Sequence, residues 1–110
     1  MAQLGRTRRA EGVLRQTLLR TPDDFTSRTR LGELLMQQGR HVEAETELRR
    51  ATTGAPRLTR AWTGLGLALG HLGRSAEAVA AHRRAVTGAP DDLGARLQLA
   101  VALTKAQDLA

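Results

Sequence analysis

The stretch Arg49–Pro56 has the sequence RRATTGAP, and Arg83–Pro90, thirty-four residues later, has the sequence RRAVTGAP. The same offset aligns residues 25–58 with residues 59–92 without a gap, and fifteen of the thirty-four positions are identical. A fixed period of this length is typical of a repeat protein. The chain is therefore predicted to consist of short structural units that stack on one another.

The repeat phase extends through the whole chain. Prolines, glycines and arginines recur in the same columns of the alignment, namely Pro22, Pro56 and Pro90; Gly5, Gly39 and Gly73; and Arg6, Arg40 and Arg74. We therefore predict a single domain. Its units are the second helix of a partial repeat (1–24), two full repeats (25–58 and 59–92), and a first or capping helix (93–110).

Each full unit is predicted to contain two helices. Apolar residues recur at helical spacing, as at Leu31 and Leu35, and a glycine suited to a helix C-terminus follows them. Asp23 and Asp91, each just after a proline, are the expected N-caps of the next helices. We expect an all-α fold of about six helices, at most seven, without strands. The breaks should lie near Gly39, Pro56, Gly73 and Pro90.

Composition supports a helical core and limits the function. Phe25 and Trp62 are the two aromatic residues, so leucine, alanine and valine must form the core. There is no cysteine, which suits a reducing compartment, and we expect a cytoplasmic protein. The longest weakly polar run, residues 64–73, is too short to span a membrane. The net charge of +6 comes from sixteen arginines and Lys105, a composition that GC-rich bacterial coding also produces.

The conserved columns resemble those of the tetratricopeptide repeat (TPR) family. The residues that carry the resemblance are Trp62-x2-Leu65-Gly66-x2-Leu69, Ala78-x3-His82 and Pro90. The resemblance covers nearly the whole chain and implies a right-handed TPR superhelix of helical hairpins. The departures from the family pattern suggest a looser array. They are Leu35, Leu69 and Leu103 in place of tyrosine, Leu48 and His82 in place of an aromatic residue, and Arg28 in the column of Trp62.

The resemblance also implies a site, because TPR proteins commonly bind ligands in a concave groove lined by the first helix of each unit. The columns place these residues in the groove: Thr26, Thr29, Arg30, Glu33, Gln37, Arg60, Thr63, Gly64, Leu67, His71, Leu97, Gln98, Val101 and Lys105. The subclass that binds the C-terminal carboxylate of chaperones uses lysines and asparagines here. This chain has no asparagine, so we set that subclass aside. A peptide with an acidic residue or two suits the remaining cations.

The sequence contains no pattern that indicates catalysis or a cofactor. Gly64–Gly70 lacks the spacing of a phosphate loop, and Gly66 is instead expected where two helices touch closely. His41, His71 and His82 lack metal-ligand spacing, so no metal is expected. His82 is expected to be half-buried with a backbone carbonyl as its partner. We predict that the chain is not an enzyme and needs no cofactor.

The second helices carry arginines that stacking would align on the outer face. We call Arg15, Arg49, Arg50, Arg83 and Arg84 the arginine ladder. It is either a solvated face neutralised by nearby glutamates, or a stripe that contacts phosphates. The first interpretation is favoured, because the aromatic residues that stack on bases are missing. The glutamates are Glu43, Glu45, Glu47 and Glu77.

These patterns predict a protein-binding scaffold. The alternatives are the docking or dimerising arm of a larger, catalytic protein and a weak nucleic-acid binder that uses the arginine ladder. At the N-terminus, Met1–Leu4 is the expected remnant of a first helix that ends at Gly5, which would leave Leu14 and Leu18 poorly covered. Apolar residues spread around 93–109, Leu99, Leu103 and Leu109 among them, so a homodimer through this C-terminal helix is the expected self-association.

Overall fold

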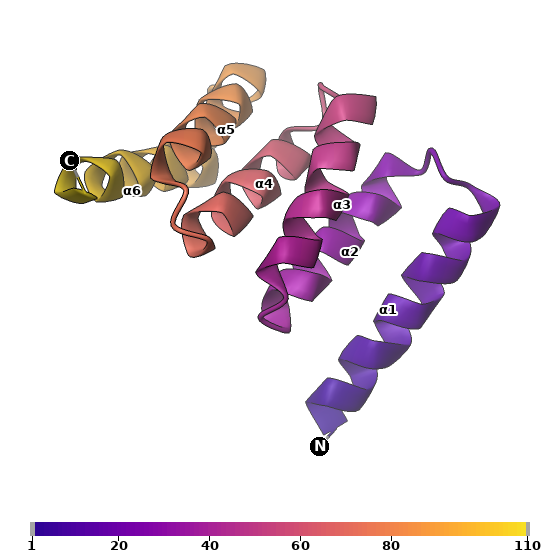
Figure 1. The fold of residues 1–110 in the computed structure, drawn as a ribbon. Coiled ribbons are helices and arrows are strands. Elements are labelled where there is room, and N and C mark those ends of the chain that lie inside the picture. Colours follow the sequence, from indigo (N-terminus) through magenta and orange to yellow (C-terminus); the bar gives the residue numbers. More distant parts are fainter. Residues whose placement is uncertain (1, 110) are drawn as a thin grey trace.

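The computed structural model describes the backbone of residues 2–109 and the side chains of residues 5–107. Within this part the chain forms six helices and no strand, so the predicted all-α helical solenoid is confirmed (Figure 1). The helices are α1 (Ala2–Arg20), α2 (Phe25–Gln37), α3 (His41–Gly54), α4 (Thr59–His71), α5 (Ser75–Gly88) and α6 (Leu93–Leu109). None of these helices is long and apolar enough to cross a membrane.

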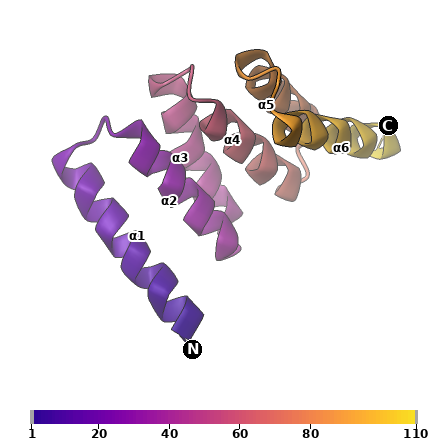
Figure 2. The same ribbon diagram turned by 180° about the vertical axis from the view of Figure 1, so that it is seen from behind.

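The helices form two layers that follow the repeat. Each helix packs against its neighbour in the chain, and α4 also contacts both α2 and α6. No such backbone contact joins α1, α3 and α5 in the described part of the chain. The first helices of the units therefore form the tighter inner layer, and the second helices form a more widely spaced outer layer. Helices α1 and α6 lie at opposite ends of the array (Figures 1 and 2).

Two glycines produce the turns inside the units. Gly39 and Gly73 adopt φ values of 78° and 77°, which side chains other than glycine rarely tolerate. After each glycine the next amide, of Arg40 or Arg74, donates to a carbonyl five residues back at 2.9 Å. This is the Schellman arrangement that satisfies the last carbonyls of a helix. The breaks predicted at these glycines are confirmed, as are those near Pro56 and Pro90.

The N-caps lie one residue later than predicted. Asp24, not Asp23, accepts from the Ser27 amide at 3.0 Å and caps α2. Asp92, not Asp91, accepts from the Ala95 amide at 3.2 Å at the start of α6. The reason is that a hydrogen-bonded turn after each proline ends at the second aspartate. Hydrogen bonds from Ser27 hold the pKa of Asp24 below its ordinary value.

The prediction for the first helix is wrong in two respects. Helix α1 continues through Gly5, which does not adopt the left-handed conformation of Gly39. A glycine permits a turn but does not impose it, and inside a helix it costs only about 1 kcal/mol. Leu18 is buried in the core, and among the described side chains of α1 the exposed large apolar ones are Val13 and Leu19. The side chains of Met1–Leu4 lie outside the described residues.

Leucine and alanine form the core, as the composition predicts. Leu48 is fully buried between α2 and α4, where a Cβ placed on Gly32 or Gly64 would come within 2.9 Å of its side chain. These glycines let the helices approach closely enough to enclose a leucine. Gly54 plays a similar part, because an added Cβ would lie 2.1 Å from the ring of Phe25. It makes room for that ring, in addition to closing α3.

Arg28 does not loosen the array, contrary to the expectation from its column. Trp62 donates its indole N–H to the carbonyl of Pro56 at 2.8 Å. One repeat earlier, Arg28 donates to the carbonyl of Pro22, also at 2.8 Å. The two unlike side chains therefore tie their helices to the preceding loop by the same bond. Arg28 additionally forms a largely buried ion pair with Glu47 at 2.8 Å.

Candidate functional site

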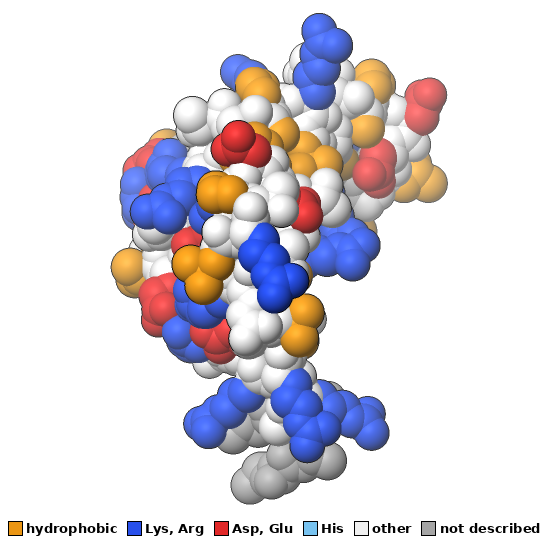
Figure 3. Space-filling view, turned by 90° about the vertical axis from the view of Figure 1, so that its right-hand side faces the viewer, with side chains coloured by type: hydrophobic (Ala, Val, Ile, Leu, Met, Phe, Trp, Pro, Cys, Tyr) orange, Lys and Arg blue, Asp and Glu red, His pale blue; other side chains and the backbone are white. Residues whose placement is uncertain are grey.

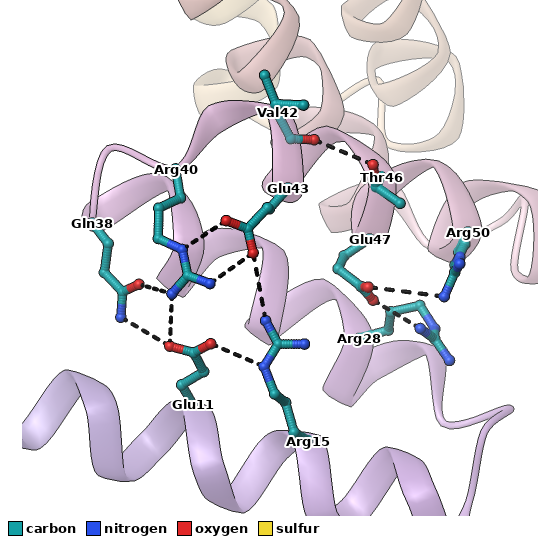
Figure 4. A network of polar contacts seen from close by, with 10 residues as sticks. All are labelled: Glu11, Arg15, Arg28, Gln38, Arg40, Val42, Glu43, Thr46, Glu47 and Arg50. Carbon is teal, nitrogen blue, oxygen red and sulfur yellow. Dashed lines mark hydrogen bonds and ion pairs between the residues drawn. The ribbon is translucent and has the colours of Figure 1, made fainter.

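The outer layer carries a cluster of four charged residues that joins α1 to the unit after it. Arg15 bonds Glu11 at 2.9 Å and approaches Glu43 at 3.8 Å. Arg40 bonds the same two acids, Glu11 at 2.9 Å and Glu43 at 2.6 Å (Figure 4). We call these four residues the first clamp. Because α1 and α3 do not touch through their backbones, these long side chains span the gap between them.

The same cluster recurs thirty-four residues later. Arg49 bonds Glu45 at 2.6 Å and Glu77 at 2.8 Å. Arg74 bonds both acids at 2.7 Å. These four residues form the second clamp, which joins α3 to α5. The connectivity is the same as in the first clamp, so the repeat encodes an ion-pair link between successive outer helices.

Hydrogen bonding within the clamps shifts the ionisation of their members. Arg15 chiefly lowers the pKa of Glu11, Arg40 that of Glu43, and Arg74 that of Glu77. In turn, Glu43 raises the pKa of Arg40 and Glu77 raises that of Arg74. The charged forms of both partners are therefore favoured. The clamps therefore hold their charges at neutral pH.

The predicted neutralisation of the arginine ladder by glutamates is confirmed for Arg15 and Arg49. Arg50 lies 3.9 Å from Glu47 (Figure 4). Arg83 differs, because Val79 occupies the column of Glu11 and Glu45, and no described carboxylate pairs with it. On the face drawn in Figure 3, acidic and basic side chains are intermixed over the upper part, and basic side chains without acidic ones lie next to the start of α1. Arg15 and Arg49 are therefore the ladder residues that pair with glutamates of a neighbouring outer helix.

The inner layer carries two adjoining hollows. The first is an open hollow of about 430 Å³ between α2 and α4. It is lined by Glu33, Met36, Gln37, Arg60, Leu67 and His71. The second is a smaller cavity of about 60 Å³ between α4, α5 and α6. Leu67 and His71 line both, so the hollows form one groove along the first helices.

The second hollow, here called the α4–α6 cavity, is lined by side chains of three helices. From α4 and α5 come Gly66, Leu67, Gly70, His71, Ser75, Ala78 and His82, and from α6 come Gln98, Val101, Ala102 and Lys105. Its floor includes His82, whose side chain is 2% exposed. No carboxylate lines it. The cavity therefore offers hydrogen-bonding groups and one cation around an apolar wall.

Eight of the residues predicted for the groove line these hollows. They are Glu33, Gln37, Arg60, Leu67, His71, Gln98, Val101 and Lys105. Thr29 does not, because it is buried and its hydroxyl donates to the carbonyl of Phe25 at 2.8 Å. Gly64 is buried against Leu48. Thr26, Arg30, Thr63 and Leu97 line neither hollow, although Arg30 is exposed on α2.

Arg60 is not a free cation. It forms a two-bond ion pair with Glu33, at 2.7 and 2.8 Å, that bridges α2 and α4. This pairing raises the pKa of Arg60. Arg30 and Lys105 have no ion-pair partner among the described side chains. Lys105 is therefore the unpaired cation among the residues that line the hollows, and Arg30 lies exposed on α2 outside them.

No pattern in the sequence predicted that His41 and His71 would meet. Their rings stack with centroids 4.4 Å apart and planes 6° from parallel, although they lie thirty residues apart on α3 and α4. The Nδ1 atom of His41 is buried without a partner. Within the described residues no three metal-ligating side chains come together. The stacked pair therefore joins α3 of the outer layer to α4 of the inner layer.

His82 differs from its prediction. It is buried rather than half-buried, and its Nδ1 has no hydrogen-bond partner instead of a backbone carbonyl. Desolvation lowers the pKa of its imidazole, so the ring is neutral at pH 7. The ring lies against Gly66, where an added Cβ would be 2.5 Å away, as expected for a close helix contact. The family pattern shows that His82 stands in place of an aromatic residue, but it does not predict the adjoining cavity.

Comparison with known proteins agrees with this architecture. The sequence profile of the tetratricopeptide repeat matches residues 2–59 and 55–93. The chain belongs to the tetratricopeptide repeat family. A search of curated proteins finds no match to it.

Solved structures with the same fold include proteins from distant organisms. MamA (residues 41 to the end) from Desulfovibrio magneticus RS-1 is 26% identical with a TM-score of 0.85; the alignment covers 97% of this chain and 60% of that one. The Sgt2 TPR domain from Aspergillus fumigatus is 18% identical with a TM-score of 0.91, covering 98% and 73%. The first TPR of Spaghetti (RPAP3), bound to an HSP90 peptide, is 19% identical with a TM-score of 0.87, covering 97% and 82%. The chain thus spans about three-fifths of the MamA structure.

Proposed function

We propose that this chain is a non-catalytic interaction module that binds a peptide or partner protein in the concave groove of α2, α4 and α6. The observation that carries the proposal is the continuous groove on the inner layer, with eight of the predicted residues lining it. The related fold of the first TPR of Spaghetti (RPAP3) was solved with an HSP90 peptide, which supports peptide binding as the role of such a surface. We place this function in the cytoplasm.

The charge of the groove favours a partner with acidic residues. Arg30 and Lys105 are unpaired among the described residues, whereas Glu33 is occupied by Arg60. The charges within each clamp cancel, so the net charge of +6 comes from the other residues. This net positive charge attracts acidic partners to the molecule. The exposed apolar residues Leu97 and Val101 lie beside the same groove. Such a surface suits an extended or helical peptide that combines apolar and acidic side chains.

The test selects binders from a library of random peptides displayed on phage. We expect the selected peptides to be enriched in aspartate and glutamate. Synthetic copies should bind the parent in fluorescence polarisation. They should lose about tenfold or more in affinity for Arg30→Glu/Lys105→Glu, because two attractive contacts become repulsive.

The matched control carries the same charge change away from the groove. Arg8→Glu/Arg83→Glu alters exposed residues of α1 and α5 and should bind nearly as well as the parent. Circular dichroism of both variants verifies the fold. If the control loses binding and the groove variant retains it, the site lies on the outer face and the nucleic-acid alternative regains support. A groove variant that binds as the parent does contradicts the groove proposal.

A second candidate role is that of a docking or dimerising arm. The C-terminal helix α6 exposes Leu93, Leu97 and Val101 at 75%, 63% and 41%, at a spacing of four residues. An apolar stripe of this kind is suited to a second helix, and a homodimer through α6 is the simplest such arrangement. Light scattering across concentrations tests it. Leu93→Glu/Leu97→Glu should convert a dimer to a monomer, and a monomeric parent contradicts it.

A further inference from the structure

The α4–α6 cavity lies where two columns of the repeat differ in character between the units. The equivalent position one unit earlier, between α2, α3 and α4, is filled by Leu48, which packs against Gly32 and Gly64. In the later unit, His82 replaces Leu48 and Gln98 replaces Gly64. Two packing residues have therefore become hydrogen-bonding residues at one place.

Two side chains around this position are also smaller than their counterparts one unit earlier. Ser75 stands in the column of His41, so the imidazole that stacks on His71 has no counterpart here. Gly70 stands in the column of Met36, which packs against the core. No atom lies within 4 Å of a Cβ added at Gly70. The loss of these two side chains accounts for the open cavity.

The groups that remain can bind an anion. The neutral imidazole of His82 is 2% exposed, and its Nδ1 has no partner within the protein. The amide of Gln98, the hydroxyl of Ser75 and the ammonium of Lys105 supply further donors along the wall. No aspartate or glutamate lines the cavity. The Nδ1 atom is closed off by the surrounding side chains, so the ring can bind a ligand only through Nε2, which lies toward Gly66.

We propose that the α4–α6 cavity receives the carboxylate of an aspartate or glutamate side chain of the bound peptide. This proposal rests on the groove-binding function above and adds the anchor that selects an acidic residue. The cavity of about 60 Å³ exceeds the roughly 10–15 Å³ that one water needs, so it holds a group of a few atoms. Lys105 at the rim provides the charge, and the donors of the floor and wall orient the two oxygens.

The experiment uses acetate as a probe for the isolated carboxylate. The parent protein at pH 7 is titrated with sodium acetate, sodium chloride or acetamide, and NMR records the imidazole signals of His82 and the side-chain amide of Gln98. We expect saturable shifts with acetate alone. Chloride controls for ionic strength, and acetamide is a neutral molecule of similar shape.

Three variants assign the binding to the cavity. Lys105→Gln removes the charge and should weaken acetate binding about tenfold or more. His82→Leu restores the residue of the earlier unit, which packs well against a glycine there, and should abolish the response at Gln98. Arg8→Gln removes an exposed cation of α1 that does not line the cavity and should leave binding unchanged.

The outcomes separate this proposal from the function on which it rests. Shifts that grow linearly, appear equally with chloride, or persist in Lys105→Gln overturn the carboxylate site even if peptides bind the groove. Saturable acetate binding with the expected variant pattern supports the site even if no displayed peptide is selected. Because Lys105 is exposed, its variant tests the proposal whether or not His82→Leu folds.

Discussion

The two junctions between successive units have the same backbone but different interiors. In the earlier junction, Leu48 fills the space between two glycines, and stacked His41 and His71 close the wall. In the later junction, His82 occupies the leucine's column and a cavity remains beside it. In the earlier junction an apolar side chain fills the space, whereas in the later one a buried imidazole lies beside the cavity. Within a repeat array, one unit can therefore supply stability while its neighbour carries the binding site that we propose.

This difference is local because the rest of the framework is unchanged. Gly39 and Gly73 make the same turn, and the first and second clamps have the same connectivity. A shared framework means that substitutions can be moved between the junctions with the surroundings nearly constant. The following variants exchange or perturb the residues that distinguish them.

The largest effect is expected when the later junction's histidine is placed in the earlier one. Leu48→His removes a fully buried leucine and introduces a polar ring with no partner. We expect a loss of about 2–5 kcal/mol in the free energy of unfolding, measured with urea. A loss below about 1 kcal/mol would mean that the two junctions tolerate polarity equally, and the contrast between them would fail.

Gly66→Leu tests the close contact that the later junction retains. The added side chain meets the His82 ring, whose nearest atoms would lie 2.5 Å from the new Cβ. Overpacking of this kind typically costs about 1–3 kcal/mol, which a urea titration resolves. Gly70→Ala is the control, because its Cβ meets no atom within 4 Å. It should stabilise the helix slightly, and equal destabilisation by both changes would refute the assigned contact.

His82→Leu should raise stability by about 1 kcal/mol, because it replaces an unsatisfied imidazole with the residue that fits the equivalent column. The gain should depend on pH. Burial lowers the pKa of His82 below its ordinary 6.5, so below pH 6.5 the unfolded chain binds a proton that the folded chain does not. The parent therefore loses stability as pH falls through this range, and the variant does not.

Thermal unfolding from pH 7 to pH 5 measures this difference. The gap between variant and parent should widen as the pH decreases. A constant gap would show that His82 titrates normally and is not desolvated in the folded protein. His71→Gln serves as the control, since it removes an exposed histidine of the same groove.

The periodicity of the sequence predicted the fold because the same columns recur in every unit. The thirty-four-residue phase placed the turns at Gly39 and Gly73 and most of the groove residues on the inner layer. It could not predict which aspartate caps a helix, since the two candidates are adjacent and the turn geometry decides between them. Contacts between units were also hidden. The stack of His41 on His71 depends on how far one unit rotates against the next.

The arginine ladder is a second case in which contacts between units could not be predicted from the sequence. Its columns were visible, and so were glutamates near it, but the sequence left open whether it binds phosphates or is neutralised. The wide spacing of the outer helices lets Arg49, and Arg74 beside it, reach across the gap to the acids of the neighbouring helix. Curvature is a property of the assembled array and is not encoded in any single repeat.

The smallest effect is expected for the second clamp. The test compares Arg49 with Arg83, which occupies the same column one unit later. Arg49→Gln removes bonds to Glu45 and Glu77 that are partly exposed, so the thermal midpoint should fall only slightly and less in high salt. Arg83→Gln should leave the thermal midpoint unchanged, because Val79 stands where the acidic partner would be.

The stabilisation by the clamp should also depend on pH. Arginines lower the pKa of Glu77, so this stabilisation is present above the ordinary glutamate value of 4.5 and is lost as the pH falls through the lowered value. The difference between Arg49→Gln and the parent should therefore shrink as the solution is acidified below pH 4.5. Equal effects of the two substitutions at pH 7 would show that the clamp contributes nothing beyond a surface charge.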